Sequence, residues 1–198
     1  MADLRNRENV LVGIINTEVD GANRIGDPVT EADTIPTSVT EALPTSMALK
    51  PAGFTGEEGL SFAVENEVEN INDMAGDVVV AIQSSSTDTL SLEFMEAANA
   101  DVLRAVKGEG DVTVETDGTI IVRNTAKETP YKSFVFDFLY QGRQVRIIVP
   151  NGRVTETGEL VYNRSDVVRY PVTITCFPDN SGTRVYTLIG PKSDPSEG

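Results

Sequence analysis

The clearest alternation of apolar and polar residues lies in the middle of the chain. Leu90, Leu92 and Phe94 alternate with polar neighbours, which is the period of a half-buried β-strand. The run 77–83 is rich in β-branched residues and predicts another strand before it. The hydroxyl-rich stretch 84–87 between these two segments predicts a turn.

The segment 62–71, which precedes these strands, is also predicted to be extended, and it carries a row of acids. Glu65, Glu67 and Glu69 point to the same side of an extended chain. Like charges on one strand face repel each other, so packing within one subunit does not favour the row. Such a row is tolerated on a face that is exposed to solvent. Alternatively, it is needed where the surface borders a space that must stay negatively charged. The acidic candidates for such a surface, including those around the turn 72–76, are Glu65, Glu67, Glu69, Asp73 and Asp77.

After Phe94 the period of the apolar residues changes to that of a helix. Ala98, Val102 and Val106 are spaced by four residues, so the sequence predicts one amphipathic helix over 96–107. Gly108 is suited to end it.

The second half of the chain alternates strands with turns. The Asp-Gly pair at 117–118 predicts a tight hairpin. In the predicted strand 133–140, the side chains of Phe134, Phe136 and Phe138 share one face, and such an aromatic row indicates the hydrophobic core.

Two prolines predict interruptions in this second half. The stretch 150–152, Pro-Asn-Gly, predicts a break after the strand 143–149. Pro171 within the predicted strand 167–177 indicates an edge strand or a bulge. Together the elements predict a mainly β fold, either a β-sandwich or a partly open barrel, with one flanking α-helix. We expect a single domain over 1–198 that ends in a flexible polar tail, 191–198.

A long stretch near the N-terminus, 17–55, shows no period of helix or strand. Its prolines, glycines and hydroxyl residues predict a long loop, and loops of this length are usually functional or disordered. Scattered apolar residues nevertheless suggest that the loop packs on something, and a neighbouring copy is one candidate. We expect the loop to be unordered before assembly, because these residues lack local partners to offset the ordering entropy. The apolar residues concerned are Ile35, Val39, Leu43, Met47, Leu49 and Phe54.

The charge of the protein is unevenly distributed. The net charge is -15 overall; residues 1–103 hold 19 acidic and 4 basic residues, whereas residues 104–198 hold 12 of each. A surface with this charge repels nucleic acid, because binding to DNA requires cationic groups that neutralise phosphates. A DNA-binding module is therefore not expected, although a surface that DNA passes without adhering is compatible with the charge.

The composition also argues against catalysis. The chain has no histidine and one cysteine, which removes the commonest general base and excludes a multi-cysteine metal site. We find no nucleotide-binding loop, nucleophile elbow or zincin helix, and the acidic turn 73–77 lacks the spacing of an EF-hand. Glu65 and Glu67 are two residues apart on one strand, not opposed across a cleft as glycosidase carboxylates are. No enzyme activity, cofactor or metal is expected.

The stretch from 53 to 106 resembles the major tail tube protein of long, non-contractile phage tails, especially those of phages that infect actinobacteria. The features that carry the resemblance are a glycine-rich entry at 53–59, an acidic strand that ends in an Asn-Asp turn, a valine-rich strand, an alternating strand that ends in Leu-Glu-Phe, and a helix that starts near an asparagine. The upstream Ala-Leu-Pro-Thr at 42–45 is similar as well.

The resemblance implies a structural virion protein that assembles into stacked hexameric rings and so forms a hollow tail tube. Each subunit would contribute a sheet to a continuous inner β-barrel, and the 17–55 loop would reach the adjacent ring. The implied partners are further copies of the chain and other tail proteins (tape measure, distal tail and terminator proteins). DNA would pass as cargo that does not adhere, without any role for a membrane. The implied location is the phage tail, assembled in the bacterial cytoplasm.

Three alternatives remain open at the level of the sequence: the placement of the glutamate row, and two rival functions. The glutamate row could line the lumen, or it could lie between rings and pair there with basic residues such as Arg143, Arg146, Arg164 and Arg169. The protein could also be a β-sandwich decoration or adhesin domain on a virion or cell surface. A carboxylate-dependent hydrolase would require a concave pocket with convergent acids.

Overall fold

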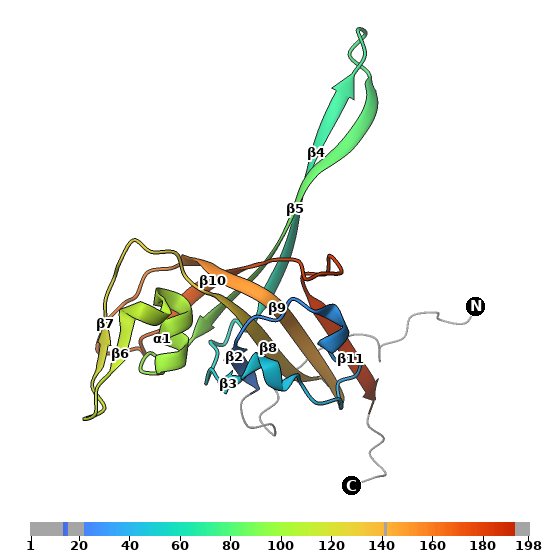
Figure 1. Ribbon diagram of the computed structural model, residues 1–198. Coiled ribbons are helices and arrows are strands. Elements are labelled where there is room, and N and C mark those ends of the chain that lie inside the picture. Colours follow the sequence, from blue (N-terminus) through green and yellow to red (C-terminus); the bar gives the residue numbers. More distant parts are fainter. Residues whose placement is uncertain (1–13, 16–21, 141, 193–198) are drawn as a thin grey trace.

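The computed structural model describes residues 14–15, 22–140 and 142–192. This part of the chain contains eleven strands and one α-helix, α1 (Ala100–Lys107) (Figure 1). Its three short 3-10 helices are Ala32–Thr34, Thr45–Met47 and Glu109–Asp111. The strands, in chain order, are β1 (Ile14–Ile15), β2 (Asn23–Gly26), β3 (Lys50–Pro51), β4 (Ser61–Asn72), β5 (Val78–Phe94), β6 (Val112–Val114), β7 (Ile120–Val122), β8 (Tyr131–Tyr140), β9 (Arg143–Thr157), β10 (Tyr170–Cys176) and β11 (Tyr186–Lys192).

Nine of these strands form one antiparallel sheet. Its hydrogen-bonded order is β3-β2-β8-β9-β10-β5-β4, with β1 added beside β8 and β11 added beside β9. β6 and β7 form the separate hairpin predicted at 117–118, where Gly118 has a φ of 88°. The large sheet does not close into a barrel, so the prediction of a mainly β, partly open architecture with one flanking helix is confirmed.

The main core lies between one face of this sheet and α1. Phe134, Phe136 and Phe138 on β8 are buried there, as predicted from their alternation. Leu90 and Leu92 on β5 join them, and their polar neighbours point to the opposite face of the sheet. The buried apolar side chains of α1 are Val102, Leu103, Ala105 and Val106.

The stretch predicted as a structureless loop, 17–55, is instead largely built into the fold from residue 22 onward; residues 17–21 lie outside the described part. β2 pairs with β8, β3 pairs with β2, and the chain between them packs on the second face of β8 and β9. Met47 and Ile35 are buried there against Val135 and Ile148. The sequence showed no period because the elements are only two to four residues long.

The helix starts later than predicted, at Ala100 instead of residue 96. Asn99 is the N-cap, and its Oδ1 accepts hydrogen bonds from the backbone N–H groups of Asp101 (3.0 Å) and Val102 (3.4 Å). The end of the helix agrees with the prediction, since Gly108 follows it with a φ of 114°, in the left-handed region that favours glycine.

Replacement of this cap provides a first prediction. Asn99→Ala should lower the free energy of unfolding by about 1 kcal/mol, because two backbone donors at the start of α1 lose their acceptor. Chemical denaturation followed by circular dichroism measures the change. Asn99→Asp serves as the control, since an aspartate also caps well and should retain most of the stability. Equal stability of the alanine variant and the wild type would contradict this role.

The predicted turn at 84–87 is wrong, because β5 runs without interruption through 17 residues. Ser85 and Thr87 pair with glutamates of β4 as ordinary strand residues, and the Oγ of Ser85 donates a hydrogen bond to Glu67 (2.8 Å). A register shift between Glu67 and Val68 absorbs one extra residue in β5 as a bulge. Serine and threonine, which favour turns locally, are here held extended by their cross-strand partners.

The two proline predictions also need correction. β9 continues through Pro150 and its neighbours to Thr157, and the Pro150 carbonyl accepts a hydrogen bond from the N–H of Val29 (2.9 Å). β10 is a central strand between β9 and β5, not an edge, and the register shift of its pairing with β9 lies between Thr173 and Ile174, two residues beyond Pro171. Pro171 is tolerated there because it is the second residue of the strand and contributes its carbonyl, which accepts from Gly158 (2.8 Å).

The predicted polar tail, 191–198, begins inside a strand, since β11 extends to Lys192; residues 193–198 lie outside the described part. Within the described residues, no helix is long and apolar enough to cross a membrane.

Candidate functional site

The hairpin formed by β4 and β5 extends beyond the hydrophobic core of the molecule. Figure 1 shows it projecting from the body as a long two-stranded ribbon. β10 pairs with β5 only as far as Asp88, so the hairpin beyond that residue has no third strand. Eight residues of β4 lie beyond this point, and at about 3.3 Å per residue the ribbon extends about 26 Å. A two-stranded hairpin is marginally stable by itself in water, so this one is expected to be covered in its working state.

Both edges of this ribbon are open. No strand within the described residues pairs with the outer edge of β4, and the distal half of β5, 78–87, has β4 as its single neighbour. All 12 residues of β4 are exposed. Open strand edges present rows of backbone N–H and C=O groups that can pair with another chain.

The two faces of the ribbon differ in chemistry near its base. On one face, Glu65 lies opposite Thr87 and Glu67 lies opposite Ser85, so this face is acidic and rich in hydroxyl groups. On the other face, β4 exposes three apolar side chains, with Asn66, which accepts a hydrogen bond from Gln83 (2.9 Å), between the second and the third. The three apolar residues are Phe62, Val64 and Val68. The ribbon therefore has a face suited to water and a face suited to protein.

The turn at the tip of the hairpin is held by one of the predicted acidic candidates. The Oδ1 of Asp73 accepts hydrogen bonds from the N–H groups of Ala75 (2.8 Å) and Asp77 (2.9 Å), and Gly76 has a φ of 91°. Asp73 therefore has a structural role in the turn that spacing alone did not indicate. Met74, at the apex, is fully exposed.

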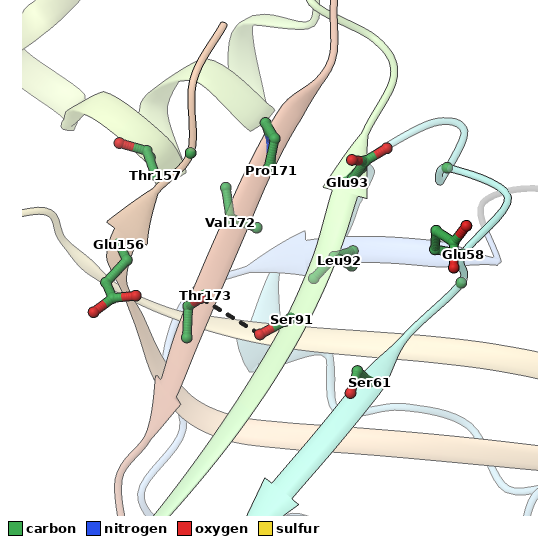
Figure 2. A pocket seen from close by; sticks show the side chains of 13 residues that line it. Glu58, Ser61, Ser91, Leu92, Glu93, Glu156, Thr157, Pro171, Val172 and Thr173 are labelled. Carbon is green, nitrogen blue, oxygen red and sulfur yellow. Dashed lines mark hydrogen bonds between the residues drawn. The ribbon is translucent and has the colours of Figure 1, made fainter.

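The acidic face of the hairpin continues onto the body of the sheet. Ser61, Ser91, Thr173 and Glu156 are paired in register across β4, β5, β10 and β9. Their side chains border a shallow hollow of about 370 Å³, where the hydroxyls of Ser91 and Thr173 are 3.4 Å apart (Figure 2). This row of four paired residues contains no large apolar side chain. The outer face of β4, β5, β10 and β9 is therefore polar along the row.

This hollow does not have the geometry of a hydrolase site. Figure 2 shows its three carboxylates, from Glu58, Glu93 and Glu156, on separate segments and not converging on one point. Glu93 is paired with Arg169 at 3.4 Å. Among the described residues, no group of three or more His, Cys, Asp or Glu side chains could hold a metal ion.

The apolar residues predicted to contact an adjacent ring lie mostly inside their own subunit. Leu43 and Leu49 are half-buried, and only Phe54, with 73% of its surface exposed, is open to another molecule. The premise that they lack local partners was wrong, whereas their role between rings stays a prediction. The buried members of the set are Ile35, Val39 and Met47.

The predicted basic partners of the glutamate row separate into two groups. Arg146 is buried on Asp137 (2.7 Å), and Arg169 is bound to Glu93 and Asp166, so both are committed within the subunit. The other two, Arg143 and Arg164, lie at least partly on the surface.

The sequence analysis missed the apolar surface of the hairpin. The valine-rich run 78–82 was interpreted as an ordinary strand of the domain, yet Val78, Val79 and Val80 are exposed. The signal that could have revealed it is the length of the paired segments. Strands of 12 and 17 residues exceed the span of a small domain, so part of their length must project.

Comparison with known proteins assigns the chain to a class, the structural proteins of phage tails. A family model described as "Phage tail tube protein" matches residues 28–197, and the chain therefore belongs to the phage tail tube protein family. No curated protein matches the sequence.

One similar solved structure is a sheath/tube terminator of an extracellular contractile injection system in its extended state. The sequence identity is 10%, the TM-score is 0.37, and the alignment covers 66% of this chain and 83% of that chain. This likeness is too weak to support an argument about function. Membership of the family makes the chain a component of the virion tail.

Proposed function

We propose that this protein is the subunit of a hollow tail tube, built from hexameric rings that stack along the tail. The observation that carries the proposal is the pair of open edges on the β4–β5 hairpin. The outer edge of β4 in one copy can pair with the distal part of β5, 78–87, in the next copy. Because these edges lie on opposite sides of one ribbon, the pairing is head-to-tail and generates a ring when the rotation closes.

The chemistry of the two faces supports a lumen position for the acidic one. Burial of an apolar face against protein is favourable, whereas burial of Glu65 and Glu67 without cations is costly. The hairpin therefore turns Phe62, Val64 and Val68 towards protein and its glutamates towards water in the bore. Carboxylates repel the phosphates of DNA, so DNA slides past the wall without adhering.

The proposal also specifies partners and location. The tube would contact other tail proteins at its ends and along its bore (terminator, distal tail and tape measure proteins), and it would be assembled in the cytoplasm of the bacterial host. We propose no catalysis and no cofactor. A long non-contractile tail and an actinobacterial host remain predictions from the sequence resemblance.

Electron microscopy of the purified protein tests the assembly. Hollow rods or rings with sixfold symmetry are expected at high protein concentration. A protein that remains monomeric under all conditions would contradict the proposal and would favour a decoration or adhesin domain instead.

A charge substitution tests the lumen. In phage particles that carry Glu65→Gln and Glu67→Gln, the tubes should form normally while the rate of DNA ejection falls, because the wall repels phosphate less strongly. The rate is measured as the DNA released per unit time at several salt concentrations. The matched control removes two exposed glutamates of the body, Glu115→Gln and Glu159→Gln, and should eject DNA as the wild type does. Loss of tubes in the lumen variant would place the glutamates at an interface between subunits.

A further inference from the structure

The distal part of the β4–β5 hairpin differs from its base in that the face with the glutamates becomes apolar there, whereas the opposite face carries Asn70, Asn72 and Gln83. On the glutamate face beyond the bulge, Glu69 lies opposite Ile82, and Ile71 lies opposite Val80. These aliphatic side chains are exposed, and the fully exposed Met74 stands at the apex. We call this part of the hairpin, residues 68–82, the tip.

The exposed Ile71, Val80 and Ile82 beside Glu69 indicate that this face of the tip is covered by protein and does not line a water-filled bore. Soluble proteins rarely expose contiguous apolar patches of this kind unless they are interaction sites. Glu69 therefore belongs to a different environment from Glu65 and Glu67, although all three share one strand face. The row of acids divides at the bulge that follows Glu67.

The same chain exposes a second apolar surface that is suited to receive the tip. Val161, Tyr162 and Val167 are exposed on the segment between β9 and β10. Val167 also lines an open hollow of about 530 Å³. The rest of its lining consists of Met95, Ala97, Ala98 and Val168, which are apolar, together with Glu96 and Asn99.

The receiving surface offers one cation, Arg164, to the acids of the tip, while the carboxylate in the hollow, Glu96, accepts a hydrogen bond from the side chain of Asn99 (3.0 Å). The tip carries Glu69 and Asp77, and no basic residue occurs between residues 51 and 103. The receiving segment exposes Arg164, for which no carboxylate partner is found within the described residues. The loop around it is held in shape by Asn163, whose Oδ1 accepts hydrogen bonds from the N–H groups of Ser165 (2.9 Å) and Asp166 (2.7 Å).

We propose that the hairpin tip of one subunit docks into the hollow beside Val167 of a second copy, with Glu69 or Asp77 pairing with Arg164 of that copy. The inference rests on the proposed assembly into a tube. The contact has to be intermolecular, because the tip lies at the far end of the ribbon from α1 (Figure 1), and the hollow is lined by residues 95–99, which directly precede α1. Met74 acts as the apolar anchor, and the ion pair fixes the orientation of the docked tip.

Engineered cysteines test the contact directly. In assembled tubes of Met74→Cys with Val167→Cys, mild oxidation should link neighbouring subunits and give a ladder of multimers on a non-reducing gel. The native Cys176 does not interfere, because burial raises the pKa of its thiol to about 12 and its side chain is enclosed. The matched control is Met74→Cys with Val122→Cys, which places the second thiol on another exposed valine. Tubes that form but do not cross-link, or that cross-link equally in the control, would overturn the inference.

A charge exchange provides the second test. Glu69→Arg and Arg164→Glu should each lower the yield of tubes at least several-fold, and the double variant should restore it. Glu65→Arg is the matched control, and Arg164→Glu should not rescue it, because Glu65 faces the bore. Failure of the double variant to restore assembly, together with failure of the cysteine pair to cross-link, would refute docking at this site. If the wild-type chain itself forms no tubes, the proposed function fails instead, so the two failures are distinguishable.

Discussion

A chain in which residues 65–87 are replaced by the dipeptide Asn-Gly should fold as a monomer and form no tubes. Val64 and Asp88 are directly paired in the β4–β5 ladder, so a two-residue type I′ turn can connect them. The deletion removes no buried side chain, because every residue from 65 to 87 is exposed or half-buried. The free energy of unfolding should therefore change by about 1 kcal/mol or less. Assembly should be lost completely, because both open strand edges and the apolar tip are removed.

Light scattering combined with size-exclusion chromatography measures the assembly, and denaturation measures the stability. A matched control shortens the other exposed hairpin by replacing residues 115–119 with Asn-Gly between the paired residues Val114 and Ile120. This control should assemble normally. Tubes formed by the variant without 65–87 would show that another surface, such as the segment 22–55, drives the assembly.

The second large effect concerns stability, and we expect it from Asp137→Ala. The Asp137 side chain is fully buried, and its carboxylate receives hydrogen bonds from Arg146 (Nε to Oδ1, 2.7 Å) and from the guanidinium of Arg24. Removal of the carboxylate leaves two mutually repelling guanidinium groups without a countercharge. The pKa of Arg24 lies below its ordinary value, mainly because the guanidinium is buried. Asp137 raises this pKa, whereas Arg146 lowers it, so repulsion between the two guanidinium groups acts in the wild-type cluster as well.

The expected loss is about 3–5 kcal/mol in the free energy of unfolding, as is typical when one partner of a buried ion pair is removed. The segment 22–52 should also become less protected in hydrogen exchange, because Arg24 lies on β2 and Arg146 donates a hydrogen bond to the carbonyl of Glu41 (3.0 Å). Asp101→Asn provides the comparison, since Asp101 pairs with Lys50 and Arg104 in a partly exposed setting and should cost less than about 1 kcal/mol. A small loss at Asp137 would show that the buried cluster does not hold this segment in place.

Much of the secondary structure could be predicted from local patterns. The alternation in 62–71, 89–94 and 133–140 identified strands that the structure contains, and the phenylalanine row on β8 is in the core. Glycine at 108 correctly predicted the end of α1. These features depend on periodicity and on backbone conformation, both of which are local properties.

The errors arose where tertiary contacts overrode local preference. Ser85 and Ser86 belong to a stretch that favours turns, yet cross-strand pairing with β4 keeps them extended. The elements within 22–52 were too short to show a period, and the charges of Arg24, Asp137 and Arg146 gave no indication that they form one buried cluster. The contact between Arg24 and Asp137 joins residues 113 positions apart, and no local pattern encodes it.

The sequence by itself determined that this protein is mainly β, strongly acidic in its first half, and equipped with a row of glutamates on one strand. Only the tertiary structure decided that this strand belongs to a ribbon with two open edges, and that the row divides into an acidic base and an apolar tip. The physical reason is that alternation specifies which side chains share a face of a strand. The rest of the fold decides which of those faces meets water, because it determines where a neighbouring strand pairs and where a strand edge stays open.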